Sequence, residues 1–256
     1  MADYNTPPDR LRAAIRSILV QTFTDFEFLI VDDGTSTDLA AVLDEFGDER
    51  IRVLGDGIHG GFAAALNRAI AESRAEFIVR IDTDDWVDPS YIDELYDFMR
   101  AHPEFDVVSA QAEEFSASGT TRVLVTPGEK RAKDVMRGST PIHAASILRR
   151  AALMRVGGYP DHRRAEDLAL WCELLLARSR LYVIPRVLYH HRVDPADFEK
   201  RKLRYRGGEL RVRLHYYPLL GAGPREYLRI AQSVAGGVLP RAIVRRLHSL
   251  RYPGST

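Results

Sequence analysis

Apolar positions follow two different spacings in the first 112 residues, and these spacings predict alternating helices and strands. Helical spacing begins after Pro7 and Pro8 and continues to about Gln21, with the apolar side chains on one face. The run Phe26–Val31 is almost continuously apolar, which is typical of a buried strand. The same criteria predict helices over 38–46, 61–73 and 88–102, and strands over 51–54, 76–81 and 106–112. Such alternation favours an α/β fold with a mostly parallel sheet flanked by helices.

Beyond residue 113 the pattern becomes less regular. It predicts short strands over 123–125, 145–148, 181–184 and 187–191, and helices over 130–137, 151–156 and 166–177. From Pro195 onward the chain is helical and basic, with breaks at proline and glycine. We therefore expect a main domain over 1–194 and a basic helical C-terminal appendage over 195–256.

Composition narrows the class of protein. The 256 residues are 45% apolar and 28% charged, which excludes a largely disordered or fibrous chain. The single cysteine, Cys172, excludes an intramolecular disulfide and fits a reducing cytoplasm. The N-terminus lacks the pattern of a signal peptide, and no apolar run approaches the ~20 residues of a membrane-spanning helix. We expect a soluble, cytoplasmic protein.

The net charge of zero hides a strong asymmetry. Residues 1–198 hold 23 Lys+Arg and 33 Asp+Glu, whereas residues 199–256 hold 13 and 3. Within 238–256, arginines flank an apolar stripe formed by Ile243, Leu247 and Leu250. This stretch predicts either a solvated helix or a helix that lies peripherally on the anionic inner face of the cell membrane. Nucleic acid is not an expected partner, because the rest of the chain is acidic.

Carboxylates follow two of the predicted strands, where ligands bind in open α/β sheets. Asp82 and Asp84 are two residues apart, share one face and could converge on Mg²⁺ or Mn²⁺. The alternative is an acidic loop whose Asp85 or Asp88 caps the next helix. Asp33 could accept a hydrogen bond from a nucleobase or ribose, or it could simply belong to a turn.

Four further residues in the second half are candidates for chemistry. Glu166 and Asp167 begin a helix, so they either stabilise the helix dipole or act as a general base on a hydroxyl. His143 precedes a strand and is either a ligand contact or a structural residue. Trp171 lies one turn after Asp167 and either stacks on a sugar ring or packs in the core.

In their order along the chain, these motifs resemble the family 2 glycosyltransferases, inverting enzymes with the GT-A fold. The resemblance covers roughly residues 4–193 and is greatest to the branch that builds bacterial surface polysaccharides. The matching stretches are residues 17–23, 28–36, 59–67, 82–85, 141–143, 157–159, 166–167 and 170–171. His59 stands where the family usually has asparagine.

This resemblance implies a metal-dependent hexosyl- or N-acetylhexosaminyl-transferase. It would move a sugar from a nucleotide-diphosphate donor, with a UDP-sugar expected, to a hydroxyl of a saccharide or lipid-linked saccharide. Asp167 would be the catalytic base beside Glu166, with Asp84 and Asp82 at the metal. His143 and Trp171 would contact the acceptor. The implied donor-binding residues are Asp33, Asp32, Asn5, Gly61, Asn67 and Asp82.

One departure concerns the start of the chain. The family normally has an apolar strand of about six to eight residues before the position of Tyr4 and Asn5, and here only three residues precede them. Either the start is truncated or misassigned, or one wall of the donor site is missing. Two alternatives remain at this point: a nucleotidyltransferase of similar architecture, and a non-catalytic carbohydrate-binding relative.

Overall fold

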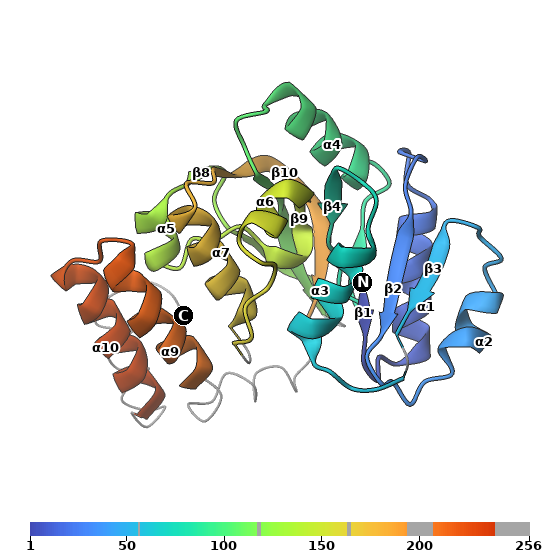
Figure 1. Ribbon diagram of the computed structural model, residues 1–256, viewed down its shortest axis with the longest axis horizontal. Helices are drawn as coiled ribbons and strands as arrows, with labels where there is room; N and C mark the ends of the chain where they lie inside the picture. Colours follow the sequence, from blue (N-terminus) through green and yellow to red (C-terminus); the bar gives the residue numbers. More distant parts are fainter. Residues whose placement is uncertain (56, 117–118, 163–164, 194–206, 239–256) are drawn as a thin grey trace.

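The computed structural model describes residues 1–55, 57–116, 119–162, 165–193 and 207–238. At one end of the molecule lies a parallel three-stranded sheet in the order β1-β2-β3 (Figure 1). Its strands and the helices of the same part of the chain are β1 (Ala2–Asp3), α1 (Pro8–Leu19), β2 (Phe28–Asp32), α2 (Leu39–Asp44), β3 (Ile51–Leu54) and α3 (Phe62–Glu72). The helices and strands predicted for this part are confirmed to within a few residues, except for β1, which the pattern did not predict.

The second sheet occupies the middle of the molecule, with the path β4-β9-β6-β10-β5 and with β7 on β6 and β8 on β10. Its strands are β4 (Phe77–Val79), β5 (Trp86–Val87), β6 (Val107–Ser116), β7 (Gly119–Leu124), β8 (Gly128–Lys130), β9 (Ser146–Arg149) and β10 (Leu181–Arg192). Of its pairings only β6–β10 is parallel. The expectation of a mostly parallel sheet is therefore wrong for this half, because a tight connection such as that between β6 and β7 returns the chain antiparallel.

Helices cover this sheet and continue beyond it to the other end of the molecule (Figure 1). They are α4 (Tyr91–Ala101), α5 (Ala132–Met136), the 3-10 turn η1 (His143–Ala145), α6 (Arg150–Arg155), α7 (Glu166–Leu176), α9 (Gly207–Leu219) and α10 (Pro224–Val238). Tyr216 of α9 donates a hydrogen bond of 2.8 Å to Glu173 of α7, and Val212 and Tyr217 share a buried cluster with Trp171. The described part of the C-terminal region thus packs onto the main body. The predicted boundary near 195 and the stripe at 243–250 lie outside the described residues.

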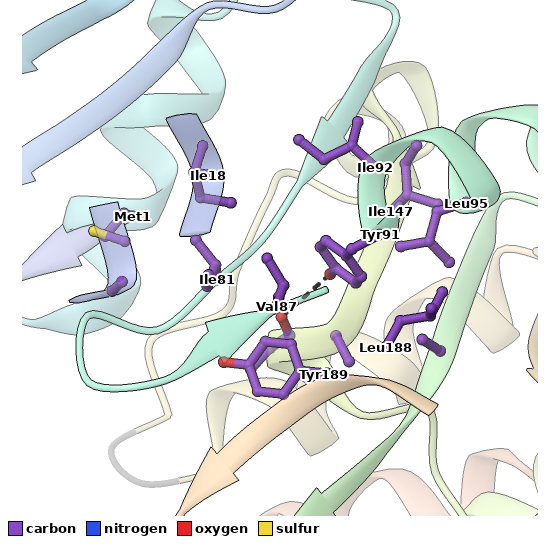
Figure 2. Close-up of a cluster of buried hydrophobic side chains, with 14 of the residues drawn as sticks. Met1, Ile18, Ile81, Val87, Tyr91, Ile92, Leu95, Ile147, Leu188 and Tyr189 are labelled. Atoms are coloured by element: carbon purple, nitrogen blue, oxygen red, sulfur yellow. Dashed lines mark hydrogen bonds between the residues drawn. The ribbon is translucent and has the colours of Figure 1, made fainter. Parts of the chain in front are cut away.

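A second buried cluster lies between the two sheets. Figure 2 shows Tyr91 and Ile92 of α4 close to Ile147 of β9, with Met1 and Ile18 on the side of the first sheet. These side chains are at most 7% exposed, and Tyr91 is fully buried. The cluster joins the two halves through side-chain packing.

The first strand pairs with β2 in the register Ala2↔Val31 and Asp3↔Asp32. Upstream of these pairs a cavity of about 320 Å³ opens beside Met1. Phe28 and Leu29 of β2 line one side of the cavity, and Phe77–Val79 of β4 line another. In the described chain no strand bridges β2 and β4 here, so the two sheets remain separate.

Candidate active site

The loop after β2 is organised by the carboxylate of Asp33, which is 5% exposed. Its Oδ1 accepts hydrogen bonds from the backbone N–H groups of Gly60 (2.8 Å) and Gly61 (3.1 Å). Its Oδ2 lies 3.1 Å from Nδ1 of His59, and the exposed ring of His59 stacks on Tyr4 at 4.1 Å between centroids. The structure therefore brings Asp33, Gly61 and the stacked rings of Tyr4 and His59 together.

Asn5 and Asp32 shape the neighbouring loop. Asn5 Oδ1 accepts from the backbone N–H of Ser36 (2.8 Å) and from its hydroxyl (2.7 Å). Asp32 Oδ1 accepts from the N–H groups of Gly34 (3.0 Å) and Thr35 (2.9 Å), as in an Asx turn. Both residues lie next to Asp33, but their side-chain oxygens are engaged in holding residues 34–36.

Asn67 lies on α3 and links this helix to the second half of the chain. Its Oδ1 accepts from the N–H of Tyr159 (2.7 Å), and its Nδ2 donates to the carbonyl of Tyr159 (2.9 Å). A Cβ on Gly158 would lie only 2.3 Å from Asn67 Oδ1, which explains the glycine at this close approach. The amide of Asn67 is used for this link, so the described structure gives it a positioning role.

The acidic motif after β4 contains three carboxylates in different surroundings. Asp85 is 2% exposed and accepts hydrogen bonds from Tyr189 Oη (2.7 Å) and the N–H of Arg192 (2.7 Å). Asp82 pairs with Arg80, whose side chain is almost fully buried. Asp84 has no ion pair with any described side chain, and burial, with the charges of Asp85 and Asp82, raises its pKa to about 6.

These surroundings determine how a metal could be held. The described residues contain no group of three His, Cys, Asp or Glu side chains placed to bind an ion. Mg²⁺ is usually bound by one or two carboxylates together with substrate phosphate oxygens and water. Asp84, unpaired and crowded by negative charge, fits that kind of site and does not fit a complete protein cage.

Glu166 and Asp167 begin α7, as predicted. Asp167 Oδ1 accepts from the N–H of Leu168 at 2.7 Å, and the side chain is reachable by solvent although protein atoms crowd around it. This crowding raises the pKa of Asp167, and the charge of Glu166 adds to the rise, whereas the Leu168 hydrogen bond and the charge of Arg80 oppose it. One carboxylate oxygen of Glu166 is buried and has no hydrogen-bond partner among the described residues, whereas Asp167 is exposed, so Asp167 is the more accessible of the two.

His143 and Trp171 pack against each other, and both rings lie inside the protein near Asp167. His143 Nε2 lies 2.7 Å from Tyr159 Oη, and burial, with the charge of Arg80, holds its pKa well below 6.5. Trp171 is fully buried, and its ring meets His143 edge-on at 5.9 Å. The expectation that Trp171 stacks on an acceptor sugar is therefore wrong in this structure, because no ring face is exposed; the core-packing alternative holds.

Two residues of this site, Arg80 and Tyr189, were not predicted from the sequence. Arg80 precedes Asp82 by two positions, a spacing that puts both side chains on one face of an extended strand. That spacing was a signal that could have identified the pair. Tyr189 gave no such signal, because it reaches Asp85 from β10, 104 residues later in the chain.

Comparisons with known proteins show which family and which solved structures this chain resembles. The sequence profile "Glycosyl transferase family 2" matches residues 1–157. The chain is 24% identical over 247 residues to the putative glycosyltransferase EpsE of Bacillus subtilis (strain 168), covering 94% of this chain and 89% of that protein. It is also 24% identical over 253 residues to the UDP-Gal:alpha-D-GlcNAc-diphosphoundecaprenol beta-1,3-galactosyltransferase of Escherichia coli, covering 92% of this chain and 91% of that protein.

Among solved structures, S. aureus TarS 1-349 in complex with UDP-GlcNAc superposes with a TM-score of 0.69. The match covers 93% of this chain and 70% of that one at 17% identity. At 17% identity, this superposition shows a similar fold and nothing more specific. No helix in the described ranges is both long and apolar enough to cross a bilayer.

Proposed function

Because the chain belongs to glycosyl transferase family 2, we propose that it transfers a sugar from a nucleotide-diphosphate donor to a hydroxyl group in the synthesis of a bacterial surface polysaccharide. The observation that carries this proposal is a convergence of elements. Asp33 accepts a hydrogen bond from Gly61 at the start of α3, and α3 contacts Tyr159 through Asn67 and Arg80 through Phe62. Arg80 in turn pairs with Asp82 of the acidic motif, and its charge lowers the pKa of Asp167 at the start of α7. Each part corresponds to one requirement of the reaction.

The first requirement is a place for the nucleotide. Asp33 fixes the loop at 59–61, and the exposed ring of His59 in this loop stacks on the ring of Tyr4. Aromatic faces of this kind can stack on a base. UDP is the expected nucleotide, supported by the UDP-sugar named for the Escherichia coli relative and by the UDP-GlcNAc complex of TarS.

The second requirement is neutralisation of charge on the leaving diphosphate. Mg²⁺ or Mn²⁺, when bound, supplies positive charge to phosphate oxygens. Asp84 would hold it, with phosphate and water completing the coordination. Asp85 does not share this role, because both of its oxygens are engaged by Tyr189 and by the N–H of Arg192.

The third requirement is a base for the acceptor hydroxyl. Asp167, at the first turn of α7, is solvent-reachable and would take the proton as the hydroxyl attacks the anomeric carbon. A single direct displacement inverts that carbon and needs no covalent intermediate with the protein, as in inverting glycoside hydrolysis with a sugar hydroxyl in place of water.

The acceptor is proposed to be a saccharide, free or lipid-linked. The name of the Escherichia coli relative, which includes a diphosphoundecaprenol acceptor, supports the lipid-linked form. Residues 238–256, with their arginines beside an apolar stripe, would then contact an anionic membrane surface. Residues 239–256 lie outside the described structure.

One assay separates this proposal from its alternatives. The chain is incubated with UDP-, GDP- and dTDP-sugars, a polyprenyl-diphosphate saccharide and Mn²⁺, and free nucleoside diphosphate is measured. Release of UDP that depends on both acceptor and metal supports a transferase. A nucleotidyltransferase would release pyrophosphate from a nucleoside triphosphate and a sugar phosphate instead. A non-catalytic relative would bind UDP-sugar without turnover.

A further inference from the structure

Arg80 follows β4 and is an unusual residue for its place. Its side chain is only 6% exposed, and a buried arginine requires a partner for its charge. One terminal nitrogen of the guanidinium pairs with Asp82 Oδ1, and the guanidinium carbon lies 5.0 Å from the ring centroid of Phe62. The backbone is fixed as well, because the N–H of Arg80 donates to Ser146 of β9 at 3.0 Å.

The charge of Arg80 changes the pKa of two other residues of the site. It lowers the pKa of Asp167 against the larger, opposite effect of burial, and it adds to the effect of burial in lowering the pKa of His143. These residues come from α7 and η1, on separate segments of the chain. Arg80 is therefore a fixed positive charge at the centre of the candidate site.

Asp82 and Asp84 differ sharply because of this charge. Asp82 is about one-third exposed and has one oxygen held by the guanidinium, whereas Asp84 has no ion pair with the described residues. A metal ion placed on Asp82 would lie close to a guanidinium that is held in place and does not lose its proton, so the two positive charges would repel each other.

We propose that Arg80 is a positioning residue that withholds Asp82 from the metal, so that Asp84 alone presents a carboxylate to the cation and Asp82 faces the donor sugar. This inference rests on the proposed function for the identity of the ligand, but its test needs no turnover. The proposal predicts a result that would not be expected if Arg80 only stabilised the fold. Removal of the guanidinium frees a second carboxylate and removes a nearby positive charge, so metal binding becomes tighter while catalysis becomes worse.

The test is a titration of the full chain with Mn²⁺ alone, followed by the EPR signal of free ion or by calorimetry. Arg80→Met is expected to bind Mn²⁺ at least about ten-fold more tightly than the parent. Adding Asp82→Asn in the same chain removes the freed carboxylate and is expected to abolish that gain. The matched control is Arg149→Met, because Arg149 also pairs with a carboxylate and lies 5.0 Å from an aromatic centroid, that of Phe77, but on β9. It is expected to leave Mn²⁺ affinity unchanged.

The melting temperature of each variant shows whether a change in Mn²⁺ binding comes from a loss of folding. Arg80→Met leaves Asp82 unpaired, so its melting temperature is expected to fall, and the double variant, which has no unpaired charge, should recover part of that loss. If Arg80→Met is too unstable to titrate, Arg80→Gln keeps a hydrogen-bond donor without the charge and carries the same expectation for Mn²⁺.

Unchanged or weaker Mn²⁺ binding in a folded Arg80→Met or Arg80→Gln chain would overturn the proposal, as would equal affinity in the single and double variants. Failure of the proposed function has a different signature. If the Asp84→Asn variant binds Mn²⁺ as tightly as the parent, the assignment of Asp84 to the metal is wrong, and so is the role of Arg80.

Discussion

The N-terminal amine of Met1 donates a hydrogen bond of 3.0 Å to the carbonyl of Leu29, and the Met1 side chain belongs to the buried cluster between the two sheets. Burial, to which the charge of Arg80 adds, lowers the pKa of this amine from 8.0 to about 5. The unfolded chain therefore binds a proton between pH 8 and pH 5 that the folded chain does not. The contribution of this amine to stability is largest above pH 8 and decreases as the pH falls to 5, by an amount on the order of 4 kcal/mol.

The cavity beside Met1 allows this effect to be tested by extension of the chain. Four apolar, strand-forming residues joined before Met1 replace the amine with a neutral amide and can occupy the space between β2 and β4. We expect a higher melting temperature, tighter UDP binding and a smaller loss of stability between pH 8 and pH 5 than in the parent. A Gly-Ser extension of equal length is the control, and it should remove the pH dependence with a smaller gain in stability. A lower melting temperature for the apolar extension would contradict this account.

A second prediction concerns the hydrogen bonds between Asn67 and Tyr159. Asn67→Asp replaces the amide group that donates to the carbonyl of Tyr159 with a carboxylate oxygen. A lost bond and two facing acceptors should cost about 1–3 kcal/mol, and turnover should fall because α3 and the segment before α7 are no longer held together. Urea unfolding and UDP release measure the two effects. Glu72→Gln, at the exposed end of α3, is the control. Parent-like stability in Asn67→Asp would show that the link is dispensable.

A third prediction concerns the metal. Asp84→Asn keeps the shape of the side chain but removes the charge that would hold Mg²⁺ or Mn²⁺. We expect turnover to fall to the level that the parent shows in excess EDTA, with the fold intact because Asp84 makes no ion pair in the described structure. Asp97→Asn, an exposed carboxylate on α4, should behave as the parent. Full turnover of Asp84→Asn, or a parent indifferent to EDTA, would refute the assignment.

The sequence predicted the fold where periodicity runs over many residues. α1 is confirmed at Pro8–Leu19, and the start of α7 is confirmed at Glu166. The strands that escaped prediction, β1, β5 and β8, are only two or three residues long and are too short to show a period. The strands predicted around Pro185 are one strand, β10, because a register shift between Val183 and Val187 accommodates the proline.

The site was predictable to a similar degree. The acidic motif follows a strand and the Asp33 loop follows another, so their position at the ends of strands follows from the pattern. The partners of Asn67 and Asp85 did not follow, because Tyr159 and Tyr189 lie 92 and 104 residues further along the chain. The burial of Trp171 likewise depends on α9, whose packing no local pattern reveals.

The protonation of Asp167 gives a fourth prediction. A base must be ionised, and burial raises the pKa of this carboxyl above its usual 3.8. At saturating metal, kcat/KM should therefore rise with pH through a pKa above 3.8. Arg80→Met removes a charge that opposes this rise, so it should move the acidic limb to higher pH. An acidic limb at or below pH 3.8, or one that Arg80→Met moves to lower pH, would argue against Asp167 as the titrating group.

The most direct test of the central claim compares the initial rate of acceptor-dependent UDP release by the parent and by Asp167→Asn, at saturating Mn²⁺ and donor. Asparagine keeps the size of the side chain and cannot accept the proton, so the account predicts a decrease of about 10²–10⁴-fold with UDP affinity retained. Glu166→Gln, the neighbouring carboxylate with a buried oxygen, should lose much less. A rate for Asp167→Asn within a few-fold of the parent would contradict the assignment of the base and, with it, the proposed arrangement of the site.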